Sequence, residues 1–464
     1  MKYPWRLTVL CICVTGNAAA VNLLDVYNRS LTADPLWQQA AATQLATRET
    51  KTQALINLLP IDVSANKNWA AVGSTTLNTP AYAALNLSVN LFSWDSWVAL
   101  KSADATVAQG EANYQAAAQS LIQRVAQQYF SVLAARETLR AQQSALQSVQ
   151  SQLDQADKNY EGGLISLTDV EAARASHDST AAAVIAAKRA LATQQNLLRA
   201  ITNESYSSLA APRDDMPLLT PDPASEDAWV TTAMNQNASL IATRMAAEVA
   251  HDSLLTAYGG HLPSVNISVS RNWALQHVNP NEPVITSTVI GVPNFGVPVN
   301  TNDIVWGLGI TVPIFTAGAT QSKVRQTRSL WDAAKSGVDF TSRQTEEQTR
   351  DSYQGVISQI AQVQALRRAV ESNRVALQAA QAGYDVGTKT VVDVLTSRDA
   401  LVQAELNYAQ AKYGYLNDIV SLRLAAGNLD RGLIERINSW LVEPASSTGP
   451  AGQQWPQLPR PGTQ

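Results

Sequence analysis

YEGGLISLTDV at residues 160–170 and YDVGTKTVVDV at residues 384–394 share one pattern, repeated 224 positions apart. Each copy starts with tyrosine, passes through glycine and ends with aspartate followed by valine. Glycine is common just past the end of a helix because it adopts positive φ without strain, and Gly162, Gly163 and Gly387 occupy such places. The stretch therefore predicts that a long helix ends here, turns and is followed by another helix.

A capping pattern follows each of these turns. Ser166 precedes Asp169 by three positions, and Thr390 precedes Asp393 by three positions. A Ser or Thr with an acid three residues later fits a capping box, in which both side chains satisfy free N–H groups at the start of a helix. The negative charges also complement the helix dipole. The two stretches are thus the predicted tips of two helical hairpins, and the chain carries one structural unit twice.

The helices on either side of the tips carry a stripe at every seventh position that is apolar except for one histidine. In the first half it contains Val125, Val132, Leu139, Leu146, Leu153 and Tyr160, then Val170, His177, Val184, Leu191 and Leu198. In the second half it contains Val356, Val363, Val370, Leu377 and Tyr384, then Val394, Leu401, Tyr408, Tyr415 and Leu422. A period of seven predicts helices that supercoil left-handedly around their neighbours. The segments from Ser96 to Tyr160 and from Gln321 to Tyr384 would each form a rod of about 95 Å.

Four short segments between the helices alternate apolar and polar residues, at about 61–70, 83–92, 263–275 and 303–315. Each is close to the 9–11 residues of a tilted membrane strand. In a soluble sandwich the apolar face would be the core, whereas in an outer-membrane barrel it would face lipid. Tryptophans near the strand ends favour the barrel, because aromatic residues gather at membrane interfaces. They are Trp69, Trp94, Trp97, Trp273 and Trp306.

Four strands do not close a barrel. An open edge in lipid leaves N–H and C=O groups unpaired, at a cost of several kcal/mol each. The pattern therefore predicts that several chains share one barrel. The loop at 276–302 is long and rich in proline, whereas the loop at 72–82 is short, so we expect the long loop on the extracellular side.

Residues 1–20 have the three parts of a signal peptide. Lys2 and Arg6 precede a short apolar run, and small residues end the segment. Cys11 and Cys13 lie inside it, so we expect an exported mature chain without cysteine. The predicted domains are a first repeat at 21–203, a linker at 204–226, a second repeat at 227–428 and a partly disordered C-terminal tail at 429–464.

Composition and motifs exclude several classes of function. Lys and Arg number 34 against 38 Asp and Glu, so the chain lacks the positive charge of a nucleic-acid-binding protein. The sequence has no Gly-rich phosphate loop, no Ser/His/Asp arrangement and no free thiol in the expected mature chain, which argues against an enzyme. The four histidines are scattered without the spacing of metal ligands, so neither a metal site nor a cofactor is expected.

These features together resemble the TolC family of bacterial outer-membrane efflux and secretion channels. The most specific signatures are YDVGTKTVVDVL at 384–395 and VPIFTAG at 312–318. The likeness extends from about Asn22 to Asn428, and it is closer to TolC itself than to lipid-anchored relatives because the mature chain would have no N-terminal cysteine. The resemblance implies a mainly α-helical fold with a β-barrel part. Three chains would each contribute four strands to one transmembrane barrel, and their helices would form a coiled-coil tunnel.

The resemblance also implies a location and partners. The barrel would lie in the lipid of the outer membrane, with the helical part in the periplasm. A periplasmic adaptor protein and an inner-membrane RND or ABC transporter would dock at the tip and open it. The chain would then be a passive exit duct for efflux or type I secretion, and the pump would select the cargo. A secreted structural or adhesive coiled-coil protein is the alternative, which explains export and heptads but not the four alternating segments.

A gate at the tips is a further implication of the resemblance. Tyr384 would hydrogen-bond Asp169 of the same chain. The cation of Lys389 would reach Asp169 and Thr168 of a neighbouring chain. TolC has arginine where Lys389 stands, and an ammonium lacks the bidentate fork of a guanidinium, so this lock would be weaker.

The resemblance also places a ring of acids at the closed end of the tunnel, and Asp393 would belong to it. Thr396 stands where the family pattern has a second acid. A trimer would therefore present fewer carboxylates at its entrance, and its preference for cations would be weaker.

Overall fold

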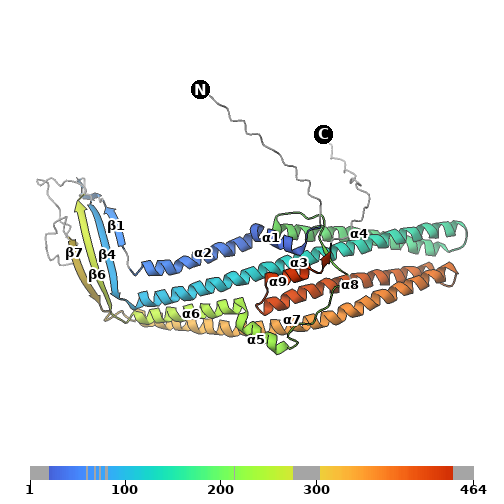
Figure 1. The fold of residues 1–464 in the computed structure, drawn as a ribbon. Helices are drawn as coiled ribbons and strands as arrows, with labels where there is room; N and C mark the ends of the chain where they lie inside the picture. The colour runs from blue at the N-terminus through green and yellow to red at the C-terminus, as the bar shows by residue number, and fades with distance from the viewer. Residues whose placement is uncertain are drawn as a thin grey trace, which may run out of the picture.

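The computed structural model describes residues 20–58, 61–66, 69–72, 75–78, 82–213, 215–274 and 304–442. The predicted leader up to residue 19, the loop at 276–302 and residues 443–464 of the predicted tail lie outside the described residues. In the described part, a long bundle of helices ends in a four-stranded sheet (Figure 1).

The order of elements repeats, which confirms the internal repeat predicted from the sequence. The first half contains α1 (Leu23–Ala33), α2 (Pro35–Ile56), β1 (Ile61–Asn66), β4 (Tyr82–Phe92), α3 (Trp94–Glu161) and α4 (Leu167–Thr202). The second half contains α5 (Glu226–Gln236), α6 (Ala238–Gly259), β6 (Ser264–Ala274), β7 (Ile304–Thr311), α7 (Ala319–Asp385) and α8 (Val391–Ala425). Shorter elements complete the described chain: β2 (Trp69–Val72), β3 (Thr75–Asn78), β5 (Ala211–Pro212), α9 (Arg431–Asn438) and β8 (Leu441–Val442).

The long helices α3 and α7 extend from the sheet to the opposite end of the molecule (Figure 1). At 1.5 Å per residue, the 68 residues of α3 span about 100 Å. α3 packs along α2, α4 and α6, and α7 packs along α6 and α8. Heptad positions form these contacts: Val125, Val132, Val356 and Val363 are at most 4% exposed. No helix in the described part of the chain has both the length and the apolar content needed to cross a membrane.

The sheet is antiparallel, with the strand order β1-β4-β6-β7. One row of directly paired residues crosses all four strands, namely Ile61, Leu87, Val269 and Trp306. Side chains in one such row point to the same face, and those in the next row point to the other face. The register therefore collects the apolar residues on one face, and Ile61 and Trp306 at its two margins are 69% and 71% exposed.

The next row contains Asp62, Asn86, Ser270 and Val305, so the opposite face is mainly polar, with an apolar residue on β7. The predicted strand at 61–70 is wrong in extent, because β1 ends at Asn66 and residues 69–72 belong to β2. β2 pairs with β3 in a separate two-stranded sheet. Asparagine has a low preference for strands, which fits an end of β1 at Asn66.

The hydrophobic core lies midway along the bundle, where α1, α9 and the linker after α4 surround α3 and α8. Tyr129, Phe130 and Tyr415 are the largest of its fully buried side chains. The hydroxyl of Tyr129 donates to the carbonyl of Ala210 at 2.7 Å. The hydroxyl of Tyr415 bonds both the N–H and the carbonyl of Leu219, at 2.6 and 3.0 Å. These bonds hold the linker against the helices.

The beginning of the predicted tail is helical. Leu433, Ile434 and Ile437 of α9 are buried in the core, and Leu441–Val442 pairs with β5. Their spacing of one and three positions places all three side chains on one face of a short helix. The described helices and strands thus extend beyond the second repeat.

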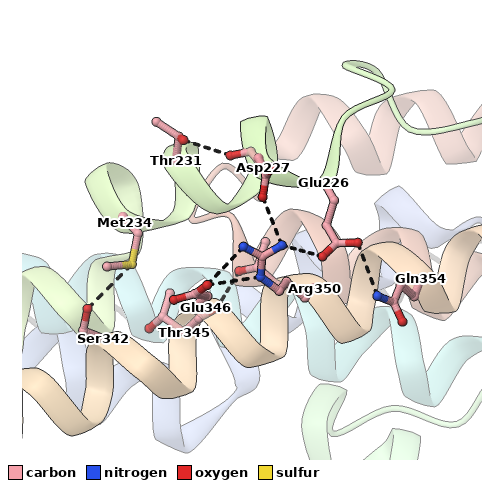
Figure 2. A network of polar contacts seen from close by, with 10 residues as sticks. Glu226, Asp227, Thr231, Met234, Ser342, Thr345, Glu346, Arg350 and Gln354 are labelled. Atoms are coloured by element: carbon pink, nitrogen blue, oxygen red, sulfur yellow. Dashed lines mark hydrogen bonds and ion pairs between the residues drawn. The ribbon is translucent and has the colours of Figure 1, made fainter.

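An ion-pair network joins α5 to α7 (Figure 2). The guanidinium of Arg350 on α7 bonds Glu226 at 2.6 Å and lies 3.0 Å from Asp227, both in the first turn of α5. The same guanidinium bonds Glu346 at 3.1 Å, and Gln354 donates to Glu226. The hydrogen bond from Arg350 holds the pKa of Glu226 below its ordinary value. The network holds the first turn of α5, which follows the linker, against α7.

Candidate functional site at the helical tips

Two turns lie at the end of the bundle far from the sheet (Figure 1). In the turn after α3, the N–H of Leu164 donates to the carbonyl of Asn159, and the N–H of Gly163 donates to the carbonyl of Tyr160. This pair of bonds is a Schellman motif, which needs one left-handed residue. Gly163 has that conformation, with φ of +70°. The expectation of positive φ at Gly162 is wrong, because this residue caps the helix with φ of −78°.

The turn after α7 has the same geometry. Thr388 donates to the carbonyl of Gly383, and Gly387 donates to the carbonyl of Tyr384. Gly387 is left-handed, with φ of +77°. The N–H of Lys389 also donates to the Gly383 carbonyl, at 3.1 Å. The carbonyl of Gly383 therefore accepts two backbone hydrogen bonds, which hold the loop that carries Lys389.

Both capping boxes predicted from the sequence are confirmed. The carboxylate of Asp169 accepts from the hydroxyl of Ser166 at 2.8 Å, and that of Asp393 accepts from the hydroxyl of Thr390 at 2.9 Å. The backbone N–H of Thr390 also donates to Asp393, at 2.9 Å. This bond and the hydroxyl bond hold the pKa of Asp393 below its ordinary value. Asp393 is therefore a carboxylate at neutral pH.

An apolar cluster joins the two hairpins at the tip. It contains Val149, Leu153, Ala156, Val170, Ala173, Val391 and Leu395. Val391 and Leu395 come from the first turns of α8, whereas the other members come from α3 and α4. The ring of Tyr384 packs against this cluster. The second hairpin therefore lies on the first through a small hydrophobic contact.

One polar bond joins the same two hairpins. The side-chain amide of Asn159 donates to the hydroxyl of Tyr384 at 3.2 Å. The expected bond from Tyr384 to Asp169 is not formed between these two described residues, because the Asp169 carboxylate caps α4 through Ser166. Sequence reasoning missed Asn159. The signal was present in the repeat, where Asn159 aligns with Gly383 and only the first copy carries a donor.

Lys389 and Thr168 lie on the surface of the tip. The ammonium of Lys389 is 4.0 Å from a carboxylate oxygen of Asp393, and the two side chains are 54% and 43% exposed. A Cβ at position 383 would lie 2.7 Å from Cγ of Lys389. Gly383, which the sequence reasoning also missed, thus lets the Lys389 side chain fold close to α7.

The five tryptophans predicted at the membrane interface are spread over the sheet region. Trp94 and Trp97 lie in the first turn of α3, and the indole N–H of Trp94 donates to the carbonyl of Leu255 at 2.8 Å. Trp306 pairs with Val269, midway along β6. Trp273 belongs to the far end of β6, and Trp69 belongs to β2 outside the four-stranded sheet. The side chains of these last two lie outside the described residues.

A protein family described as outer membrane efflux protein matches residues 26–204 and 229–428, which cover both halves of the chain. The chain belongs to this outer membrane efflux protein family. TolC of Vibrio cholerae serotype O1 is 31% identical over 424 residues, which cover 91% of this chain and 94% of that protein. TolC of Escherichia coli K12 is 28% identical over 433 residues, covering 92% and 86%. The alkaline protease secretion protein AprF of Pseudomonas aeruginosa is 24% identical, covering 93% and 90%.

Solved structures of other outer membrane proteins share the fold. The outer membrane protein VceC of Vibrio cholerae superposes with a TM-score of 0.72 at 19% identity, covering 87% of this chain and 96% of that one. The CmeC channel of Campylobacter jejuni superposes with a TM-score of 0.71 at 18% identity, covering 95% and 98%. The expected TolC family and outer-membrane location are confirmed. This outer membrane efflux protein is a channel and not an enzyme.

Proposed function

We propose that three copies of the chain form one passive exit duct through the outer membrane. The sheet carries this proposal, because it exposes an apolar face, and no other described strand pairs with the outer edges of β1 and β7. Three sheets joined edge to edge would pair every strand and turn the apolar face to lipid. The polar face would then line water.

The helices would continue this duct across the periplasm. α3 and α7 are long enough to carry the tips about 100 Å from the sheet. The relatives of this chain include AprF and PrtF, both described as protease secretion proteins, and its family is described as outer membrane efflux protein. We therefore propose that a periplasmic adaptor and an inner-membrane RND or ABC pump dock at the tip, supply the energy and select the cargo.

Purified membranes test the trimer. The protein should need detergent for extraction and should migrate as a trimer that heating converts to a monomer. A cysteine placed in β1 of one chain should cross-link to a cysteine placed in β7 of another chain. This reaction should succeed in the unheated sample and fail in a sample whose chains were first separated by heating. A chain that stays soluble and monomeric without detergent would favour the secreted coiled-coil alternative.

Closure of the tip is proposed to depend on the gate residues. Tyr384 holds the second hairpin to the first through Asn159. Lys389 is exposed at the surface, where it would reach Asp169 and Thr168 of a neighbouring chain in the trimer. Docking of the partners would break these links and move α7 and α8 outward.

Conductance in planar bilayers tests this gate. Tyr384→Phe combined with Lys389→Ser should raise single-channel conductance, because both the bond to Asn159 and the cation are removed. Tyr160→Phe is the matched control, since Tyr160 is the repeat counterpart of Tyr384 and is 45% exposed. Equal conductance in the double variant and the wild type would contradict the proposed lock.

Asp393 is the proposed member of the acidic ring at the entrance. Its depressed pKa keeps the carboxylate charged near neutral pH. Asp393→Asn should lower the preference for cations over anions, measured as a reversal potential in a salt gradient. Thr396→Asp should raise this preference by adding the second acid of the family pattern. Selectivity that is unaltered in both variants would rule out the ring.

A further inference from the structure

A cluster of charged residues lies on α6, close to the sheet and far from the tips. Glu248, His251 and Asp252 occupy positions i, i+3 and i+4, so they share one face of the helix. One ligand-type atom from each side chain lies within 4.8 Å of the others. The ammonium of Lys101 on α3 bonds Glu248 at 2.9 Å and Asp252 at 2.8 Å.

Asp252 is unusual within this cluster. Its side chain is 0% exposed, and its Oδ2 atom has no hydrogen-bond partner. A buried carboxylate oxygen without a partner costs free energy, and a cation or hydrogen-bond donor normally satisfies it. Lys101 contacts only the other oxygen, Oδ1. The cluster thus offers more negative charge than the single ammonium satisfies.

His251 adds a potential metal ligand to the cluster, and this imidazole is not needed for the ion pairs of Lys101. Its ring nitrogen Nδ1 is 3.9 Å from Asp252, and the ring packs on Trp331 of α7 with centroids 5.0 Å apart. Imidazole nitrogen together with carboxylate oxygen is a ligand set that suits Zn²⁺ and similar transition metals. A purely structural ion pair requires only the two acids and Lys101.

We propose that Glu248, His251 and Asp252 bind a divalent transition metal of the Zn²⁺ class, in exchange for the ammonium of Lys101. Zinc bonds of about 2.0–2.2 Å place neighbouring ligand atoms about 3.3 Å apart. The present separations of up to 4.8 Å therefore have to shorten by at most about 1.5 Å to close the site. Glu248 and His251 are 46% and 33% exposed, so both have room to move. Water would complete the coordination.

Lys101 links the proposed metal site to the packing of α3 on α6. Its side chain is 54% exposed, so the ammonium can swing into solvent when a metal enters. All three proposed ligands belong to α6, whereas Lys101 belongs to α3. Metal binding therefore replaces an ion pair between two helices with bonds inside one helix. The site is independent of the proposed gate at the tips.

Metal titration of the intact trimer tests the proposal. The full-length chain, in detergent, without a histidine tag and stripped with a chelator, is titrated with ZnCl₂ in a calorimeter and with Co²⁺ by its visible absorption. We expect one ion per chain. Because loss of an outer-shell partner alone weakens metal sites 10–100-fold, His251→Ala and Asp252→Asn should each weaken binding at least about tenfold. Lys101→Met should tighten it by removing the competing cation.

His177→Ala is the matched control, since His177 lies 3.0 Å from the neighbouring Asp178 on α4 and belongs to no cluster of three ligands among the described residues. It should leave binding unchanged. Migration as a heat-modifiable trimer identifies variants that fold, and His251→Ala removes the imidazole without affecting the Lys101 ion pair. The proposal is overturned if the wild type binds no Zn²⁺, or if His251→Ala binds as tightly as His177→Ala. If Lys101→Met binds Zn²⁺ no more tightly than the wild type, the proposed exchange between the metal and the Lys101 ammonium is wrong.

Discussion

The backbone at Gly387 has φ of +77°, and a Cβ there would meet nothing within 4 Å. Any effect of a side chain at this position is therefore backbone strain rather than a clash. Gly387→Ala should destabilise the closed turn by about 1 kcal/mol, because the left-handed conformation is unfavourable for L-residues with a Cβ. Hydrogen exchange of the amides at 387–389 should accelerate about fivefold as a result.

Gly387→Asn separates strain from other effects of the substitution. Asparagine adopts the left-handed region more readily than alanine, so its amides should exchange at a rate between those of the wild type and Gly387→Ala. Slower exchange in Gly387→Ala than in the wild type would show that the turn does not need the left-handed conformation.

Individual residues were predictable where the requirement is local. Gly387 and the two capping aspartates follow from backbone rules that act within a few positions. The partner of Tyr384 was not predictable in this way, because Asn159 is 225 positions away. Asp169 looked suitable by charge, but its carboxylate was already used by the capping box that the same sequence predicts.

Two acids face each other where α8 packs on α7. Burial raises the pKa of Asp418 on α8, and the nearby charge of Asp351 on α7 raises it further. The ionised carboxylate is thus less stable in the folded chain than in the unfolded one. Stability is lost as pH rises from the ordinary aspartate pKa of about 3.9 through the raised value. Asp418→Asn should therefore raise the melting temperature of the detergent-solubilised protein at neutral pH.

The pH dependence identifies the cause of that increase. Near pH 3, below the ordinary aspartate pKa, both proteins are uncharged at position 418, and their melting temperatures should converge. Asp351→Asn is the control on the other helix. It removes only the smaller of the two causes, so its stabilisation at neutral pH should be smaller than that of Asp418→Asn. A constant difference across this pH range would contradict the assignment to ionisation.

Elements with a strong period were predictable, and short ones were not. β6 and β7 follow from alternation in which every second residue is apolar, such as Ile304, Trp306 and Leu308. The hairpin of β2 and β3 was missed because it has four residues per strand, too few to show a period. α9 was missed because a helix of eight residues within a Pro- and Gly-rich end resembles a tail.

At the scale of the whole molecule, the two faces of the sheet should tolerate charge differently. Leu308 is 66% exposed on the apolar face, midway along the edge strand β7 and opposite Ile267. An arginine at the middle of a lipid-facing surface costs about 2–4 kcal/mol, so Leu308→Arg should reduce the yield of the proposed heat-modifiable trimer in membranes. Asn86→Arg, on the polar face beside Asp62, should leave the yield close to wild type. Equal yields would show that the apolar face does not contact lipid.

The open edges of the sheet also have a kinetic consequence. Among the described strands of one chain, β1 and β7 each pair on one side only, so the four-stranded sheet presents two unpaired edges and a wide apolar surface at once. Such a surface favours aggregation in water, and unpaired edges are costly in lipid. Newly exported chains would then have to meet before or during insertion. The rate of duct formation should therefore rise more steeply than linearly with chain concentration, and low expression should leave chains exposed to proteases for longer.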